Sequence, residues 1–178
     1  MPASADSLAA GRAYQQTLLA ALGKDDPVIA QAQTPALLRT LVAEAGSDLR
    51  TRPEPAEWSA IELIGHMVDA ELASSMRYRW ILAEAEPDLV PYDQDLWAAR
   101  LHSTSESLDD LLPLFDALRA ANLRLWRATP VADRTRVGQH LERGPESYEL
   151  TFRLLAGHDR VHVAQARAGL ARIRARRS

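Results

Sequence analysis

Two histidines that lie four residues apart near the C-terminal end, His158 and His162, are the first residues whose spacing suggests chemistry. On a helix this spacing places both rings on one face, with Cβ atoms about 5–6 Å apart, so that one divalent ion can contact both. Leu154 and Leu155 share that face, whereas Arg160 lies on the opposite one. The pair is therefore expected to point into the interior of the protein.

A third ligand is expected from another helix. Buried histidines are costly unless each ring nitrogen has a partner, and a divalent metal ion meets that need while the rings stay neutral. His66 is the best candidate, because Ala70, Trp80 and Ile81 lie on its side of a predicted helix and make that side face the core. The chain has no cysteine, so His, Asp or Glu must hold any metal.

Two polar residues could support the histidines. Asp69, three residues after His66, could accept the free ring N–H of that histidine or act as a general base. Gln165 shares the face of His162 and could orient a ligand or contact a substrate. A different interpretation also fits the sequence: the three histidines could be core residues that hydrogen-bond to backbone carbonyls or to Glu62, Asp69 and Gln165, without a metal.

Other candidate residues lie near these positions in the sequence. Tyr92 and Trp97 follow the helix of His66 and could line the mouth of a substrate pocket. The remaining titratable residues receive structural interpretations. We expect His102 at the surface or in a loop and Glu62 in a helix cap. Glu71 is expected in an ion pair or a packing contact, and Asp159 is expected to pair with Arg153 or Arg160 on the helix surface or to contact the metal.

Start and stop signals predict helices and no strands. Ser59 and Glu62 form a capping box, which predicts a long helix over residues 59–85. Thr34 followed by Pro35 predicts a helix over residues 34–46, and Ser147 begins one that continues into the Arg-rich end. Further helices are expected over residues 6–22 and 107–128. Alternating strand patterns and Asn-Gly or Asp-Gly hairpin turns are absent.

The helices and their connections predict the fold class. Four long helices with two long connections, residues 86–106 and 131–146, indicate an all-α four-helix bundle that is not simple up-and-down. Gly65 and Gly157 lie inside predicted helices, where glycine costs about 1 kcal/mol relative to alanine. Each of these glycines is therefore expected to face a close neighbour.

Composition and charge are those of an ordinary soluble domain and disfavour membrane, secreted and nucleic-acid-binding proteins. The chain has 178 residues, of which 47% are hydrophobic and 25% charged, as in ordinary soluble domains. No apolar run is long enough to span a membrane, and residues 1–6 lack the segments of a secretory signal, so we expect a cytoplasmic protein without a membrane partner. The net charge of -3 does not favour nucleic acid, and the arginines at the end suit the negative end of the last helix.

Two patterns together resemble those of a known superfamily. They are Trp58-Ser59 with His66-x-x-Asp69-x-Glu71 and Arg77, and His158-Asp159-x-x-His162-x-x-Gln165 near the far end. This combination resembles the DinB-like superfamily of metal-binding four-helix bundles. The likeness extends over about residues 30–172, so we expect a single domain over residues 1–178, with residues 1–29 as an N-terminal helical arm.

The resemblance implies an up-down-down-up bundle with a long connection between its second and third helices. It also implies that His66, His158 and His162 hold a divalent metal, and relatives lead us to expect a homodimer. Members of the superfamily include S-transferases that use bacillithiol, mycothiol or glutathione, and a mycothiol-dependent maleylpyruvate isomerase. His140 lies in a matching loop, but the proline often found after that histidine is absent, so no role is carried over to it.

Three neutral imidazoles leave a divalent ion with an open position, as in catalytic zinc sites. A water or thiol there would become a nucleophile near pH 7. We therefore expect a metal-dependent transferase of a low-molecular-weight thiol, or a hydrolase, that acts on a small electrophilic substrate, with Zn, Ni, Mn, Fe or Co as the ion. Two alternatives stay open: a catalytically silent metal-binding or stress-response bundle, and a helical scaffold without a metal.

Overall fold

The computed structural model describes residues 5–177, so the first four residues and the last one of the predicted domain lie outside the described part. Helices make up most of the described residues. They are α1 (Ala5–Leu22), α2 (Pro27–Ala45), α3 (Ala60–Ala83), α4 (Gln94–Leu101), α5 (Leu108–Ala128) and α6 (Tyr148–Ala175), with short 3-10 turns at Gly46–Asp48 and Val131–Thr135.

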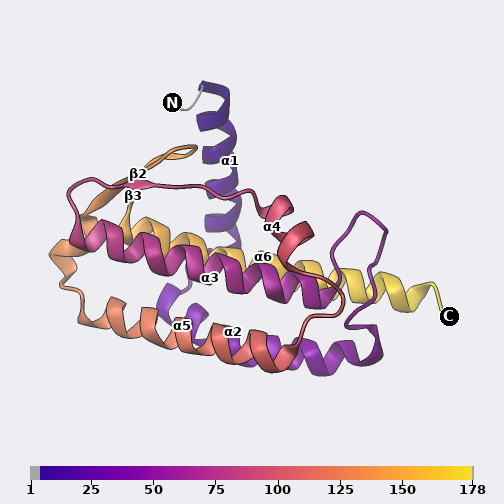
Figure 1. Ribbon diagram of the computed structural model, residues 1–178. Helices are drawn as coiled ribbons and strands as arrows, with labels where there is room; N and C mark the ends of the chain where they lie inside the picture. The colour runs from indigo at the N-terminus through magenta and orange to yellow at the C-terminus, as the bar shows by residue number, and fades with distance from the viewer. Residues whose placement is uncertain (1–4, 178) are drawn as a thin grey trace.

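Helices α2, α3, α5 and α6 form a four-helix bundle (Figure 1). Helices α2 and α6 run in one direction along the bundle, and α3 and α5 run in the other. The order is up-down-down-up, which confirms the expected fold class. The connection over residues 84–107 carries α4 back along the bundle, and this return allows α3 and α5 to lie parallel.

Side-chain caps define where the two helices that carry His66, His158 and His162 begin. The Ser59 side chain accepts from the backbone N–H of Glu62, and the Glu62 carboxylate accepts from the backbone N–H of Ser59, so the predicted capping box is present. Glu62 also forms an ion pair with Arg52. The Ser147 hydroxyl accepts from the backbone N–H of Leu150, which starts α6 where the sequence predicts it.

The predicted start of the second helix at Thr34 is wrong. Helix α2 begins at Pro27, because the carboxylate of Asp26 caps its first turn and proline suits that position. Pro35 consequently lies inside the helix and has no N–H for the carbonyl of Gln31. The guanidinium of Arg119 donates to that carbonyl at 3.0 Å instead.

A small sheet contradicts the prediction that strands are absent. Strand β2 (Val137–His140) pairs in parallel with β1 (Asp88–Leu89) and antiparallel with β3 (Gly144–Ser147). The β2–β3 turn needs Gly144, whose φ of 81° lies in the left-handed region. These strands have two to four residues each and no diagnostic turn dipeptide, so the sequence pattern does not reveal them.

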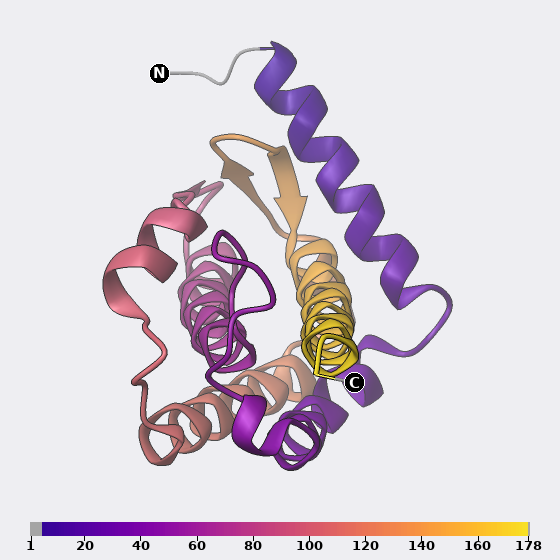
Figure 2. The same ribbon diagram turned by 90° about the vertical axis from the view of Figure 1, so that its right-hand side faces the viewer.

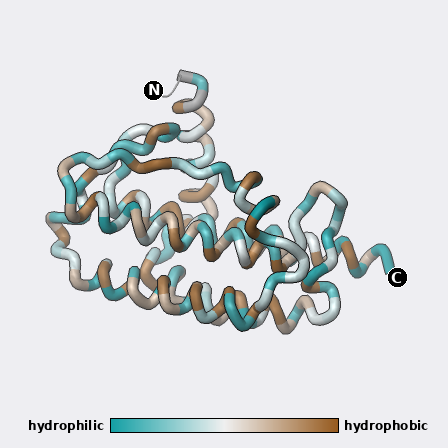
Figure 3. The backbone as a smooth tube through the Cα atoms, viewed as in Figure 1, coloured by the Kyte–Doolittle hydropathy of each residue, from teal (hydrophilic) through white to brown (hydrophobic). Residues whose placement is uncertain are grey.

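Two apolar clusters occupy opposite halves of the bundle, and a polar layer separates them. Figure 3 shows hydrophobic residues recurring along the bundle helices between hydrophilic ones. One cluster is built around Phe115 and Leu170, and the other around Tyr78 and Phe152. The layer between them contains His66, Glu71, Arg119, His158 and Asp159, all buried.

Helix α1 runs across the bundle and packs on the outer side of α6, whereas α4 lies beside α3 (Figure 2). Gly157 makes this crossing possible, because a Cβ at that position would lie 2.0 Å from the carbonyl oxygen of Leu18. The close neighbour expected at Gly157 is thus the backbone of the N-terminal helix. None of the described helices combines the length and the apolar composition needed to cross a membrane.

Candidate metal centre

Three histidine side chains from two helices converge in the polar layer. His66 comes from α3, and His158 and His162 come from successive turns of α6. Nε2 of His66 lies 3.1 Å from Nε2 of His158 and 3.3 Å from Nε2 of His162. One ring nitrogen from each histidine lies within 4.8 Å of the other two. The structure therefore brings together the residues that the spacing singles out.

Burial keeps these rings neutral. His66 and His158 are 1% and 6% exposed. Burial, together with the nearby His162, lowers the pKa of His66 from 6.5 to about 3. Burial also lowers the pKa of His158 and of His162. At pH 7 each ring thus has an unprotonated nitrogen, which is the form that binds a metal.

The arrangement of the three rings fits a divalent ion. Three facing nitrogens cannot pair completely with one another, because a proton on one of them satisfies only one neighbour. Nitrogens bound at zinc-ligand distances in tetrahedral geometry lie about 3.3 Å apart, close to the two measured separations. Nδ1 of His158 is buried and has no partner among the described residues, whichever group its Nε2 binds.

Neighbouring side chains hold two of the rings. The amide oxygen of Gln165 lies 2.9 Å from Nδ1 of His162, which places the proton on Nδ1 and leaves the lone pair on Nε2. The Trp58 ring packs against His66, with ring centroids 5.0 Å apart. Gln165 itself is exposed. Among the three histidines, its side chain contacts His162.

The Asp69 carboxylate pairs with His102, and not with His66 as the sequence had suggested. Its Oδ2 lies 2.6 Å from Nε2 of His102, at the C-terminal end of α4, and this contact raises the pKa of His102. His102 lies in the loop directly after α4, which is one of the two placements expected for it, but its side chain is only 7% exposed. A Cβ at Gly65 would lie 2.5 Å from the His102 ring. Gly65, a glycine inside a predicted helix, was the one feature of the sequence that indicated a close neighbour such as His102.

A buried ion network behind the histidines joins the bundle helices. Arg119 of α5 donates to Glu71 of α3 at 2.6 Å and to Asp159 of α6 at 2.7 Å. Thr34 of α2 donates to the same Asp159 oxygen. Glu71 thus forms an ion pair, which is one of the two roles expected for it, and the helix-surface pairing expected for Asp159 is wrong. Because these contacts restrain rotation of α3 and α6, they keep the histidines facing one another.

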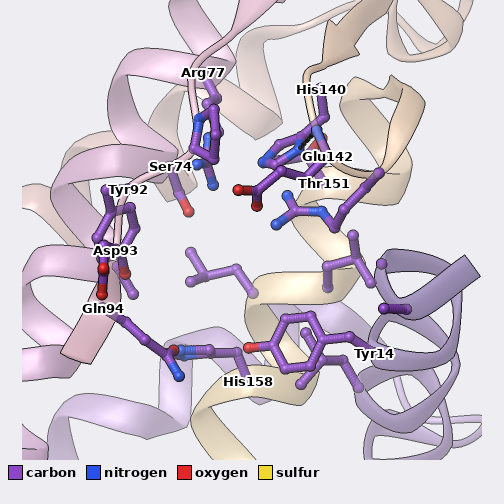
Figure 4. A pocket seen from close by; sticks show the side chains of 18 residues that line it. Tyr14, Ser74, Arg77, Tyr92, Asp93, Gln94, His140, Glu142, Thr151 and His158 are labelled. Atoms are coloured by element: carbon purple, nitrogen blue, oxygen red, sulfur yellow. Dashed lines mark hydrogen bonds between the residues drawn. The ribbon is translucent and has the colours of Figure 1, made fainter. Parts of the chain in front are cut away.

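One of the three histidines, His158, lies in the wall of a cavity of about 450 Å³. Helices α1, α3 and α6, residues 91–94 and the β2–β3 hairpin form the other walls (Figure 4). This volume lies in the range of small-molecule sites. Tyr92 lines the cavity, and Trp97 contacts the Tyr92 ring with centroids 4.5 Å apart.

No role was predicted for two buried residues of this cavity, although both stand at positions that resemble the superfamily. Arg77 and His140 lie at the end opposite His158 (Figure 4). Their position in one cavity could not be predicted, because α3 and the hairpin that contribute them are far apart in the sequence.

The arginines at the C-terminal end form ion pairs within the fold. The pairs are Arg167 with Glu44, Arg172 with Glu57, Arg176 with Glu54, and Arg177 with Asp48. Acidic side chains of this chain therefore neutralise much of the positive charge of the last stretch.

Comparisons with known proteins match this architecture. A sequence model of the DinB superfamily matches residues 28–166. A Bacillus cereus protein provisionally named as a metal-dependent hydrolase is 27% identical over 107 residues, which are 60% of this chain and 61% of the relative. A protein of Oceanobacillus iheyensis with the same provisional name is 27% identical over 131 residues, 73% of this chain and 76% of the relative. The chain thus spans about three-fifths of the length of the first of these relatives.

A solved structure shares the fold. YfiT from Bacillus subtilis, described as a probable metal-dependent hydrolase with an unusual four-helix bundle topology, superposes with a TM-score of 0.76 and 23% identity. The superposition covers 84% of this chain and 87% of that one.

Proposed function

Since the chain belongs to the DinB superfamily, we propose that it is a metal-dependent enzyme that acts on a small electrophilic substrate, with hydrolysis as the leading reaction. The observation that carries this proposal is the convergence of three buried Nε2 atoms, from His66, His158 and His162, beside a cavity. The provisional names of the matching relatives support the reaction class.

The chain's own residues have separate parts in this proposal. His66, His158 and His162 would hold the ion through Nε2, and Gln165 keeps His162 in the tautomer that allows it. When bound, a divalent ion supplies Lewis acidity, which stabilises negative charge on a nucleophile or on the substrate. The cavity beside His158 would position the substrate.

Transfer of a low-molecular-weight thiol is the second candidate reaction. The chain contains no cysteine, so the sulfur nucleophile would have to come from a cosubstrate. The cavity of about 450 Å³ is large enough to hold such a group beside a small electrophile. Hydrolysis and thiol transfer differ only in the nucleophile, so one assay can separate them.

The test is an assay of metal-free protein reloaded separately with Zn, Ni, Mn, Fe or Co. Each form is given a panel of small activated esters and epoxides, with and without a low-molecular-weight thiol. We expect turnover only in a metal-loaded form, loss of turnover in His158→Ala, and unchanged turnover in Arg127→Gln, which alters an exposed residue of α5. Turnover without thiol indicates hydrolysis, and turnover that requires thiol indicates transfer. Metal binding without turnover on any substrate would instead support a catalytically silent bundle.

A further inference from the structure

Arg77 is a buried cation in the cavity wall, and it forms no ion pair with any of the residues that the structure describes. Its side chain comes from α3, and the residue is 7% exposed. Nη2 donates to the carbonyl of Val90 at 3.0 Å, whereas Nε is buried and has no partner among the described residues. Arginine remains charged at pH 7 even where burial lowers its pKa, as it does here. A buried charge of this kind is costly unless an anion reaches it.

His140 adds a second free donor at the same end of the cavity. It is 2% exposed, and its Nδ1 accepts the backbone N–H of Glu142 at 3.2 Å. The ring proton is therefore on Nε2, which is buried and has no partner among the described residues. Burial and the nearby Arg143 lower the pKa of His140 to about 3. The ring is thus neutral at pH 7, and its buried N–H lacks an acceptor among the described residues.

The cations Arg77 and Arg143 lie around this end together with three carboxylates, and Arg77 forms no ion pair with any of the described residues. Arg143 is paired with the buried carboxylate of Glu146, which also accepts from Gln15. Two further carboxylates line the cavity, those of Asp93 and Glu142, and both residues are exposed. Among the described residues, none of these carboxylates forms an ion pair with Arg77.

We propose that the Arg77 and His140 end of the cavity binds a carboxylate of the substrate, so that the substrate is a small monoanionic carboxylic acid. Its electrophilic part would extend toward His158 at the other end (Figure 4). A planar carboxylate suits two N–H donors and one cation that lacks an ion-pair partner, whereas a phosphate dianion needs more of both. The apolar residues Ala70 and Leu154 of the same cavity suit the carbon chain between the two ends.

This inference rests on the proposed function, because it assigns the cavity beside the histidines to the substrate. Its test nevertheless uses metal-free protein and measures binding. Butanoate, the neutral butanamide and inorganic phosphate are titrated by calorimetry, and the Nε–H signal of Arg77 is followed by NMR. We expect saturable binding of butanoate with a shift of that signal, and binding of butanamide and phosphate at least about tenfold weaker.

Variants of Arg77 and His140 test whether butanoate binds at this end of the cavity. Arg77→Gln is expected to weaken butanoate binding about tenfold or more, and His140→Phe to weaken it by a smaller factor. Arg127→Gln removes an exposed arginine of α5 as the matched control and should leave the affinity unchanged. If Arg77→Gln does not fold, Arg77→Lys removes the Nε–H signal while retaining the charge, and it should show intermediate affinity.

Several results would overturn the proposal. They are equal binding of butanamide and butanoate, preferential binding of phosphate, no saturable shift of the Arg77 signal, or unchanged affinity in a folded Arg77→Gln protein. The two proposals can also fail separately. Butanoate binding to a protein that takes up no metal would contradict only the metal-dependent function, and metal uptake without butanoate binding would contradict only the carboxylate site.

Discussion

At the scale of single residues, the state of one ring nitrogen decides whether a histidine can bind a metal. Burial lowers the pKa of His66 to about 3, so its ring stays neutral well below pH 7. In His162, the contact of Nδ1 with Gln165 selects the tautomer that presents Nε2 to the other two rings. The metal-binding form therefore exists before any ion arrives.

The first prediction concerns Gln165, which touches the proposed centre only through His162. Gln165→Ala is expected to lower zinc affinity about 10- to 100-fold while one ion per chain still binds, because the ring of His162 loses its orientation. Competition with a chelator measures this change. Gln16→Ala, which alters an exposed amide of α1, is the control. Equal affinities in wild type and Gln165→Ala would show that the contact does not position the ring.

The sequence predicted the three histidines because two lie on adjacent turns of one helix and the third on a core-facing side. It did not predict the partners of His102 and Asp159. Asp69 lies 33 residues from His102, and Arg119 lies 40 residues from Asp159. Helical spacing carries information over only a few residues, so contacts of this separation become visible only in the fold.

At the scale of secondary-structure elements, close contacts between helices shape the cavity. Helix α1 lines one wall of the cavity and crosses α6 at Gly157. The backbone of Leu18 occupies the space that a Cβ on Gly157 would need. The position of α1, and with it the closure of the cavity, thus depends on this glycine.

Gly157→Ala should displace α1 and lower the free energy of unfolding by about 1–3 kcal/mol. Alanine favours a helix by about 1 kcal/mol over glycine, so any loss must come from the contact with Leu18. Urea unfolding measures the loss, and limited proteolysis reports the release of α1. Ala168→Gly, at an exposed position of α6, is the control, and it measures how much glycine costs relative to alanine in this helix. A variant as stable as the wild type with α1 equally protected would contradict this account of the crossing.

Local sequence signals predicted the starts of α3 and α6 but not the start of α2 or the small sheet. Capping residues predicted the starts of α3 and α6 correctly, since a cap acts within four residues. The start of α2 was misplaced because Pro35 resembles a first helical residue, and only the distant Arg119 satisfies the carbonyl that this proline leaves free. The small sheet was missed because its strands are too short for an alternating pattern.

At the scale of the whole molecule, four buried histidines make the metal-free fold sensitive to acid. Burial lowers the folded-state pKa of His66, His140, His158 and His162, whereas an unfolded chain has histidine pKa values near about 6.5. Below about pH 6.5 the unfolded state therefore binds more protons than the folded state. The free energy of unfolding consequently decreases as the pH is lowered. The contribution of His102 to this pH dependence has the opposite sign, because Asp69 raises the folded-state pKa of His102.

Urea unfolding of the metal-free protein should therefore show lower stability at about pH 5.5 than at about pH 7.5. Each of the four histidines contributes a slope of at most about 1.4 kcal/mol per pH unit, and His102 offsets part of it. His140→Phe removes one of the four and should flatten the slope. Stability that is constant or increases on acidification over this range would show that the four rings are not held neutral by the fold.

The central claim is that His66, His158 and His162 form a metal centre on a fold that does not need the ion to assemble. Elemental analysis of protein purified without chelator and without a histidine tag tests it most directly, with His158→Ala beside the wild type and circular dichroism to confirm the fold. The account predicts about one divalent ion per wild-type chain and none in the folded variant. A wild-type protein that carries no ion and shows no change in thermal unfolding with Zn, Ni or Mn would contradict it, as would a His158→Ala protein that retains its ion.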